Sequence, residues 1–135
     1  MVNVVIWNEF VHEQEDEHVK SIYPKGIHGC IKEFLSDDKS LNIKTATLEE
    51  KDHGLSEELL DKTDVLIWWG HKAHKLVEDK IVDRVQQRVL EGMGLLVLHS
   101  GHHSKIFKRM MGTTANIRWA ERGEMERVWV CNPGH

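Results

Sequence analysis

The sequence has no long apolar run, no excess of basic residues and almost no cysteine. None of its apolar stretches approaches the ~20 residues that cross a bilayer, so we expect no membrane association. The net charge is -4 at pH 7 and the basic residues form no stripe, which argues against nucleic-acid binding. The segment Met1-Val2-Asn3-Val4-Val5 also lacks the basic stretch and cleavage site of a signal peptide.

The two cysteines, Cys30 and Cys131, each lie within an apolar pattern. We expect buried, reduced thiols and a cytoplasmic location rather than a disulfide framework. Phosphate-binding glycine motifs are missing as well. The stretch Asn8-Glu9-Phe10-Val11 follows the first apolar run and has no glycine that would let a backbone approach a phosphate. We therefore expect no nucleotide cofactor.

What is present is a regular alternation of apolar strands and amphipathic helices. Hydrophobic content of 40% and charged content of 30% are typical of one soluble domain, here residues 1–135. The expected strands are Val2 to Trp7, Leu41 to Leu48, Val65 to Trp69, Leu95 to Leu98, Thr114 to Trp119 and Arg127 to Cys131. The expected helices cover Ile27 to Leu35, Leu55 to Leu60 with Ser56 as cap, Val77 to Leu90 and Lys105 to Met111. This order predicts a doubly wound α/β fold with a mostly parallel sheet.

The segment from Glu9 to Ser21 carries the acidic run Glu13-Gln14-Glu15-Asp16-Glu17. We interpret it as a long polar loop whose charges face solvent.

Most of the ten histidines follow the ends of these apolar runs in three clusters. His12 comes after the first run, His71 and His74 after Trp69, and His99, His102 and His103 after Leu98. Parallel strands end at one edge of a sheet, which is where open α/β sheets bind ligands. The clusters therefore predict a cleft rich in imidazole, which is both the neutral-pH acid/base and the commonest metal ligand.

The run Leu98-His99-Ser100-Gly101-His102 is typical of a nucleophile elbow, a sharp strand-to-helix turn that lifts one side chain above the sheet. With four other stretches it resembles the trehalose-utilisation, or ThuA-like, proteins of the class I glutamine amidotransferase-like superfamily. The matching stretches are Val5 to Glu9, Tyr23 to Gly29, Trp69 to His74, Gly92 to His102 and Asn132 to His135. The resemblance covers essentially the whole chain. It implies a flavodoxin-like three-layer α/β sandwich and a role in disaccharide use.

Two departures from the superfamily pattern limit this resemblance. Amidotransferases place a cysteine nucleophile in the elbow, whereas His99 occupies that position here, so thiolate attack on glutamine is not expected. ThuA-like proteins also continue past the stretch that ends at His135. We therefore expect a C-terminally shortened ThuA-like domain, corresponding to its N-terminal part.

A divalent metal, zinc before others, is one expected occupant of the cleft. His12, His71 and His102 are the expected ligands, since a catalytic zinc takes three protein ligands and keeps one position open. The His-x-x-His spacing of His71 and His74 is repeated by His99 and His102. The alternative is that these imidazoles cap helix ends or bind backbone carbonyls.

The remaining candidates divide between catalysis and substrate binding. His99, Ser100 and His102 are the catalytic candidates, although Ser100 would need an acid to orient its base and its alternative role is to stabilise the turn. The candidates for substrate binding are Trp7, Asn8, His28, Trp69 and Lys105. Among these, Trp7 or Trp69 would stack on a sugar ring, and Asn8 and Lys105 would bind its hydroxyl or carbonyl groups.

Three classes of function remain open. The first is an enzyme that acts on a disaccharide or keto-sugar derivative, in which an imidazole removes a proton next to a carbonyl, with or without a metal. The second is a carbohydrate- or metabolite-binding module, and the third is an assembly subunit. In all three we expect a homo-oligomer, because a shortened sheet leaves an apolar edge uncovered.

Overall fold

The fold is built on a parallel four-stranded sheet, seen in a computed structural model that describes residues 1–120, 122–125 and 127–134. The strands are β1 (Val2–Asn8), β2 (Leu41–Thr47), β3 (Val65–Trp69) and β4 (Gly94–Leu98). Their order across the sheet is β2-β1-β3-β4, and every neighbouring pair is parallel. The predicted α/β class and the predicted neighbours β1, β3 and β4 are confirmed.

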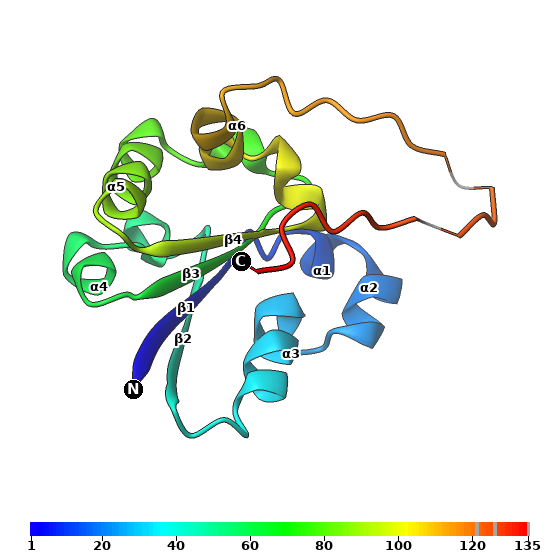
Figure 1. Cartoon of the computed structure of the whole chain (residues 1–135). Coiled ribbons are helices and arrows are strands. Elements are labelled where there is room, and N and C mark those ends of the chain that lie inside the picture. The colour runs from blue at the N-terminus through cyan, green and yellow to red at the C-terminus, as the bar shows by residue number, and fades with distance from the viewer. Residues whose placement is uncertain (121, 126, 135) are drawn as a thin grey trace.

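Helices cover both faces of the sheet and complete a three-layer sandwich (Figure 1). One face carries α3 (Gly26–Leu35), and the other carries α5 (Asp79–Leu90) and α6 (Lys105–Met111). The layers follow from the alternation of side chains along a strand. In β1, Val4 and Ile6 pack with the core beneath α3, whereas Val5 and Trp7 pack with the larger core beneath α5 and α6.

Serine side chains define where two helices begin. Helix α4 (Glu57–Asp61) starts after Ser56, whose side chain accepts a hydrogen bond from the Leu59 amide, as the sequence predicted. Helix α6 starts after Ser104, which accepts from the Phe107 amide in the same way. Each serine satisfies one of the amides that the first turn of a helix leaves without a partner.

The acidic segment after β1 is helical rather than the loop that was expected, although Glu15 and Glu17 are exposed as predicted. It forms two short helices, α1 (His12–Glu15) and α2 (Glu17–Ile22). Asp16 ends the first helix and caps the second by accepting from the His18 and Val19 amides. Glu9 and Glu13 are buried, with exposed fractions of only 3% and 2%. Sequence charge alone did not reveal this burial, because it depends on amide donors from other parts of the chain.

Three further expectations are corrected. Both cysteines are exposed, and α3 turns Ile31 and Leu35 rather than Cys30 toward the sheet. Residues 114–119 and 127–131 form no strand, since no described segment pairs with them.

His135 lies outside the described residues. Among those that are described, no helix has both the length and the apolar character needed to cross a membrane.

The leucines of the sheet offer a direct test of which face is core. Leu66 in β3 is fully buried, whereas Leu96 in β4 is 51% exposed. We expect Leu66→Ala to lower the free energy of unfolding by about 2 to 5 kcal/mol, through lost burial and a residual cavity. The matched change Leu96→Ala should cost less than about 1 kcal/mol. Urea unfolding followed by circular dichroism measures both, and equal losses would contradict the core assignment.

Candidate functional site

Strands β1, β3 and β4 end at the same level, and the residues that follow them form the candidate site. Asn8 of β1 lies beside Trp69 of β3, which in turn lies beside Leu98 of β4. The residues that follow each of these positions therefore emerge together at the carboxyl edge, as the histidine clusters predicted. This edge brings His12, His71 and Ser100 into contact although they come from separate segments.

His71 and Ser100 form the central pair of this edge. His71 Nδ1 lies 3.0 Å from Ser100 Oγ, and the ring of His12 stacks on that of His71 with centroids 4.6 Å apart. Burial and then the neighbouring His12 lower the pKa of His71 below its ordinary value of 6.5. His71 nevertheless remains exposed, so it presents a neutral imidazole to solvent at pH 7.

Trp69 extends this pair into an aromatic surface. Its ring is nearly parallel to that of His71, with an angle of 10° and a centroid separation of 6.4 Å. Trp69 is half-buried, so part of its ring is accessible. Of the two tryptophans proposed to stack on a sugar, it is the one that lies next to His71.

A buried carboxylate holds the turn that carries His71. Oε2 of Glu9 accepts hydrogen bonds from the amides of His71, Lys72 and Ala73 at 2.7, 2.8 and 2.9 Å. Oε1 of Glu9 lies 3.2 Å from His74 Nδ1, a contact that is an ion pair when His74 is protonated, although neither atom has an aligned hydrogen bond among the described residues. Consecutive amides that converge on one oxygen stabilise its negative charge.

Two opposing effects set the pKa of Glu9, and the hydrogen bonds to its carboxylate outweigh burial. Burial, the largest single influence, raises the pKa of this carboxyl. The His74 side chain and the amides of His71 and Ala73 lower it, and together they hold the pKa below its ordinary value of 4.5. Glu9 is therefore ionised at neutral pH, and its charge fixes the position of the turn after β3.

Two positions at this edge leave no room for a side chain and are occupied by glycine. A Cβ at Gly70 would lie 2.8 Å from Glu9 Oε1 and 3.0 Å from His74 Nδ1. A Cβ at Gly101 would lie 2.7 Å from a methyl carbon of Val97. Gly70 therefore lets the carboxylate approach its turn, and Gly101 lets the chain after β4 close against the sheet.

Asn8 belongs to a second polar cluster under the same edge. Its Nδ2 donates to Glu13 Oε1 at 2.6 Å and contacts His28 Nδ1 at 2.9 Å, and its Oδ1 accepts from the Phe10 amide. Asn8 is fully buried, whereas His28 is partly exposed. Burial lowers the pKa of His28 below 6.5. Of these two substrate-binding candidates, His28 is reachable from solvent and Asn8 positions it.

The turn after β4 has the strained start that an elbow requires. His99 is exposed and has a φ of 30°, a positive value that residues other than glycine rarely adopt. Its Nδ1 lies 3.4 Å from Ser100 Oγ. His102 lies further along the same 3-10 helix (His99–His103), and its Nδ1 contacts the Ala115 carbonyl instead of the His71 pair.

Two substrate-binding candidates have structural roles instead. Trp7 is fully buried, its ring stacks on Trp68 and its Nε1 donates to the His53 carbonyl. It is therefore not available to a sugar ring. Lys105 donates to the Val77 carbonyl and to Asp79 at 2.7 and 2.8 Å. Its ammonium group holds the start of α5 to α6, so the role assigned to it is corrected as well.

The three expected metal ligands do not converge in this arrangement. The rings of His12 and His71 are stacked with an angle of 17°, so their nitrogen lone pairs lie in nearly parallel planes. His102 is engaged with Ala115. In the described part of the chain, no three histidine, cysteine, aspartate or glutamate side chains are grouped so that they would hold a metal ion.

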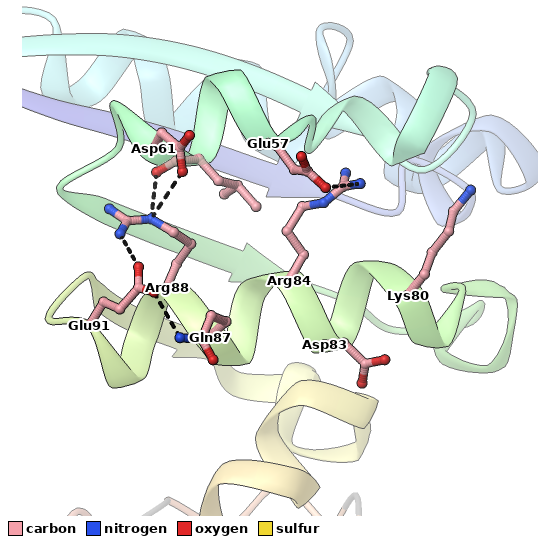
Figure 2. A pocket seen from close by; sticks show the side chains of 9 residues that line it. Glu57, Asp61, Lys80, Asp83, Arg84, Gln87, Arg88 and Glu91 are labelled. Carbon is pink, nitrogen blue, oxygen red and sulfur yellow. Dashed lines mark hydrogen bonds and ion pairs between the residues drawn. The ribbon is translucent and has the colours of Figure 1, made fainter.

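Two concavities differ in their relation to this edge. A groove of about 450 Å³ between α4 and α5 is crossed by ion pairs (Figure 2). There Arg84 pairs with Glu57, and Arg88 pairs with Glu91 and lies near Asp61. These arginines fasten α5 to α4. The second concavity, of about 760 Å³, is lined by His74 and His103 and therefore lies at the histidine edge.

Comparison with known proteins identifies the family. The model of the ThuA family, whose description is trehalose utilisation, matches residues 3–135. The chain belongs to the ThuA family. No curated protein matches the sequence. Glu9, His71 and Ser100 all lie within the stretches on which the resemblance was based.

Sequence reasoning missed two residues of this candidate site. They are Glu9, which holds the turn after β3, and Glu13, which holds Asn8. A signal for Glu9 was present, because it is a single acid directly after a buried apolar strand. Glu13 had no such signal, since it lies within an acidic run.

The structure predicts that Glu9 is needed for folding of the edge. Glu9→Gln keeps the volume but removes the charge that three amides and His74 bind, so we expect a loss of about 2 to 4 kcal/mol in unfolding free energy. Glu15→Gln removes a carboxylate that pairs only at the surface, with Lys72 at 3.1 Å. That control should cost less than about 1 kcal/mol. Chemical denaturation measures both variants, and similar losses would argue against a special role for Glu9.

Proposed function

We propose that this ThuA-family chain acts on a sugar or keto-sugar derivative, with His71 as its general acid/base. The observation that carries the proposal is the pair of His71 and Ser100, joined at 3.0 Å and delivered by two neighbouring strands. Accessible imidazole with a pKa below 6.5 is unprotonated at neutral pH and suited to accept a proton.

The tautomer of His71 decides which chemistry the pair performs. If Nδ1 carries the proton and donates to Ser100 Oγ, then Nε2 has a free lone pair and acts as the base. If Nε2 carries the proton, Nδ1 instead accepts from the Ser100 hydroxyl and activates it as a nucleophile. A serine nucleophile of this kind needs a carboxylate that orients the ring. Among the described residues Glu9 binds the backbone of His71, and no carboxylate hydrogen-bonds to its ring.

The favoured reaction is therefore proton transfer at a carbon next to a carbonyl. His71 Nε2 takes the proton, and the two electrons of the C–H bond pass into an enolate on the substrate. The imidazolium then returns the proton to carbon or oxygen. Trp69 would offer a platform for the sugar ring, because its ring lies parallel to that of His71. His28 and His99 would reach its hydroxyl groups.

We expect this chain to catalyse exchange of the acidic C–H of a keto-disaccharide with deuterium. The exchange, followed by proton NMR in D₂O, should fall more than about a hundredfold in His71→Asn, since a general base contributes 10²–10⁴-fold. The rate should hold at neutral pH and decline only at a pH below 6.5. The lowered pKa of His71 keeps its imidazole neutral until that more acidic pH, where protonation removes the base. His18→Asn, at an exposed site on α2, is the control. Absence of exchange with the unchanged protein would contradict the proposal.

A metal-assisted form of this reaction is the alternative proposal. It needs His12, His71 and His102 to reorient, because their donor atoms do not meet at one point as arranged. We expect protein purified without chelator to contain less than about 0.1 equivalent of zinc, and its exchange rate to be insensitive to EDTA, since a catalytic zinc requires three converging ligands. Elemental analysis decides the question. One equivalent of zinc that is lost in His71→Asn would favour the metal-assisted form.

A sugar-binding module is the second candidate function, favoured by the accessible Trp69 ring. Binding of a disaccharide without proton exchange would support it over the enzyme. An assembly subunit is the third, and the exposed Leu96 on β4 supports the expected homo-oligomer. The oligomeric state and the cytoplasmic location stay predictions.

A further inference from the structure

The larger cleft at the histidine edge has a lining of unusual charge. It lies beside the turn that follows β3, and Lys72, which lines it, is the residue after His71. The charged and titratable residues that line it are Glu15, Lys72, His74, Lys75, His103 and Lys108. Three lysines therefore face one carboxylate in a protein whose net charge is -4. The lining of this cleft therefore carries a local excess of positive charge.

The three lysines of the cleft differ in their ion pairing. Lys72 pairs with Glu15 at 3.1 Å, which neutralises both groups. Lys75 and Lys108 make no ion pair with any residue that the structure describes. They come from different elements, since Lys75 lies in the 3-10 helix His74–Leu76 and Lys108 lies in α6. Two lysines without an ion pair among the described residues thus line the cleft, one from each of these two elements.

The other acid near the cleft is Glu9, which contacts His74, is 3% exposed and is already bound by three amides. Its charge offsets part of the positive charge, but its buried carboxyl is not open to a ligand. His103 reports the resulting environment. Burial and then the nearby His102 and Lys108 lower the pKa of His103 below 6.5, with His74 adding to the same effect. The cleft therefore combines two lysines with the imidazole of His103. A bound anion would stabilise the protonated form of that imidazole.

We infer that this cleft binds an anionic group of the substrate, a phosphate or a carboxylate, between Lys75, Lys108 and His103. Ammonium groups and imidazole are suited to phosphate and carboxylate oxygens, with which they form charge-assisted hydrogen bonds. The volume of about 760 Å³ accommodates more than the anion alone. An anion subsite then favours an acidic or phosphorylated sugar derivative over a neutral one as the substrate of the proposed reaction, a conclusion that rests on the proposed function.

The experiment compares anions and neutral sugars by calorimetry and by NMR of the histidine rings. The probes are inorganic phosphate, a sugar phosphate, a sugar carboxylate and an uncharged disaccharide. We expect the charged sugars to bind more tightly than the uncharged one, and bound phosphate to raise the pKa of His103. Whichever charged sugar binds more tightly identifies the anion. Equal affinity for charged and uncharged sugars, or no binding of phosphate, overturns the inference.

Matched variants locate the site. The double change Lys75→Gln with Lys108→Gln should weaken phosphate binding about tenfold. Lys32→Gln, at an exposed position on α3, removes the same kind of charge elsewhere and should change binding less than about twofold. Glu15→Gln should strengthen binding, because Lys72 would then be unpaired. Equal weakening by Lys32→Gln would show non-specific attraction and overturn the inference.

One variant separates this inference from the proposed function. His71→Asn should lose C–H exchange and retain phosphate binding. Loss of phosphate binding in the lysine variant, with C–H exchange of a neutral keto-sugar unchanged, supports a distinct anion subsite. If C–H exchange needs no anion and the unsubstituted protein binds no anion, the inference is overturned and the proposed function stands.

Discussion

The candidate site depends on one interaction, the buried carboxylate of Glu9 bound to the turn after β3. An ionised group at 3% exposure is costly unless charge-assisted hydrogen bonds compensate for its lost hydration. Three consecutive amides and His74 supply that compensation, and Gly70 leaves the space for it. The arrangement joins β1 to β3 at their carboxyl ends and leaves the His71 ring free to face solvent. A general base on a flexible turn would lack this fixed position.

Most of the fold follows from local patterns in the sequence. The runs that form β1 and β3 are apolar enough to be buried on both faces, and the period of α5 matches a helix that covers a sheet. Ser56 marked the start of α4 correctly. The tail could not be predicted in this way, because a strand needs a partner and no described segment pairs with residues 127–131.

The site was predictable in outline but not in its assignments. Strand ends predicted that Asn8, His12, His71 and His102 line one pocket. The structure brings His12, His71 and Ser100 into contact, whereas His102 contacts Ala115. Sequence could not show that Trp7 points into the core while Trp69 stays accessible, since this depends on the register of β1 and β3. Nor could it show that Lys105 is bound to the start of α5 or that Lys75 and Lys108 share a cleft. These facts depend on contacts between distant segments.

The central claim is that His71 is a neutral base whose Nδ1 proton points to Ser100. Nitrogen-15 NMR of the histidine rings measures both the tautomer and the pKa of His71 in the intact protein. The account predicts an Nδ1–H tautomer at neutral pH and a pKa below 6.5, caused first by burial and then by His12. An Nε2–H tautomer, or a pKa at or above 6.5, would contradict it.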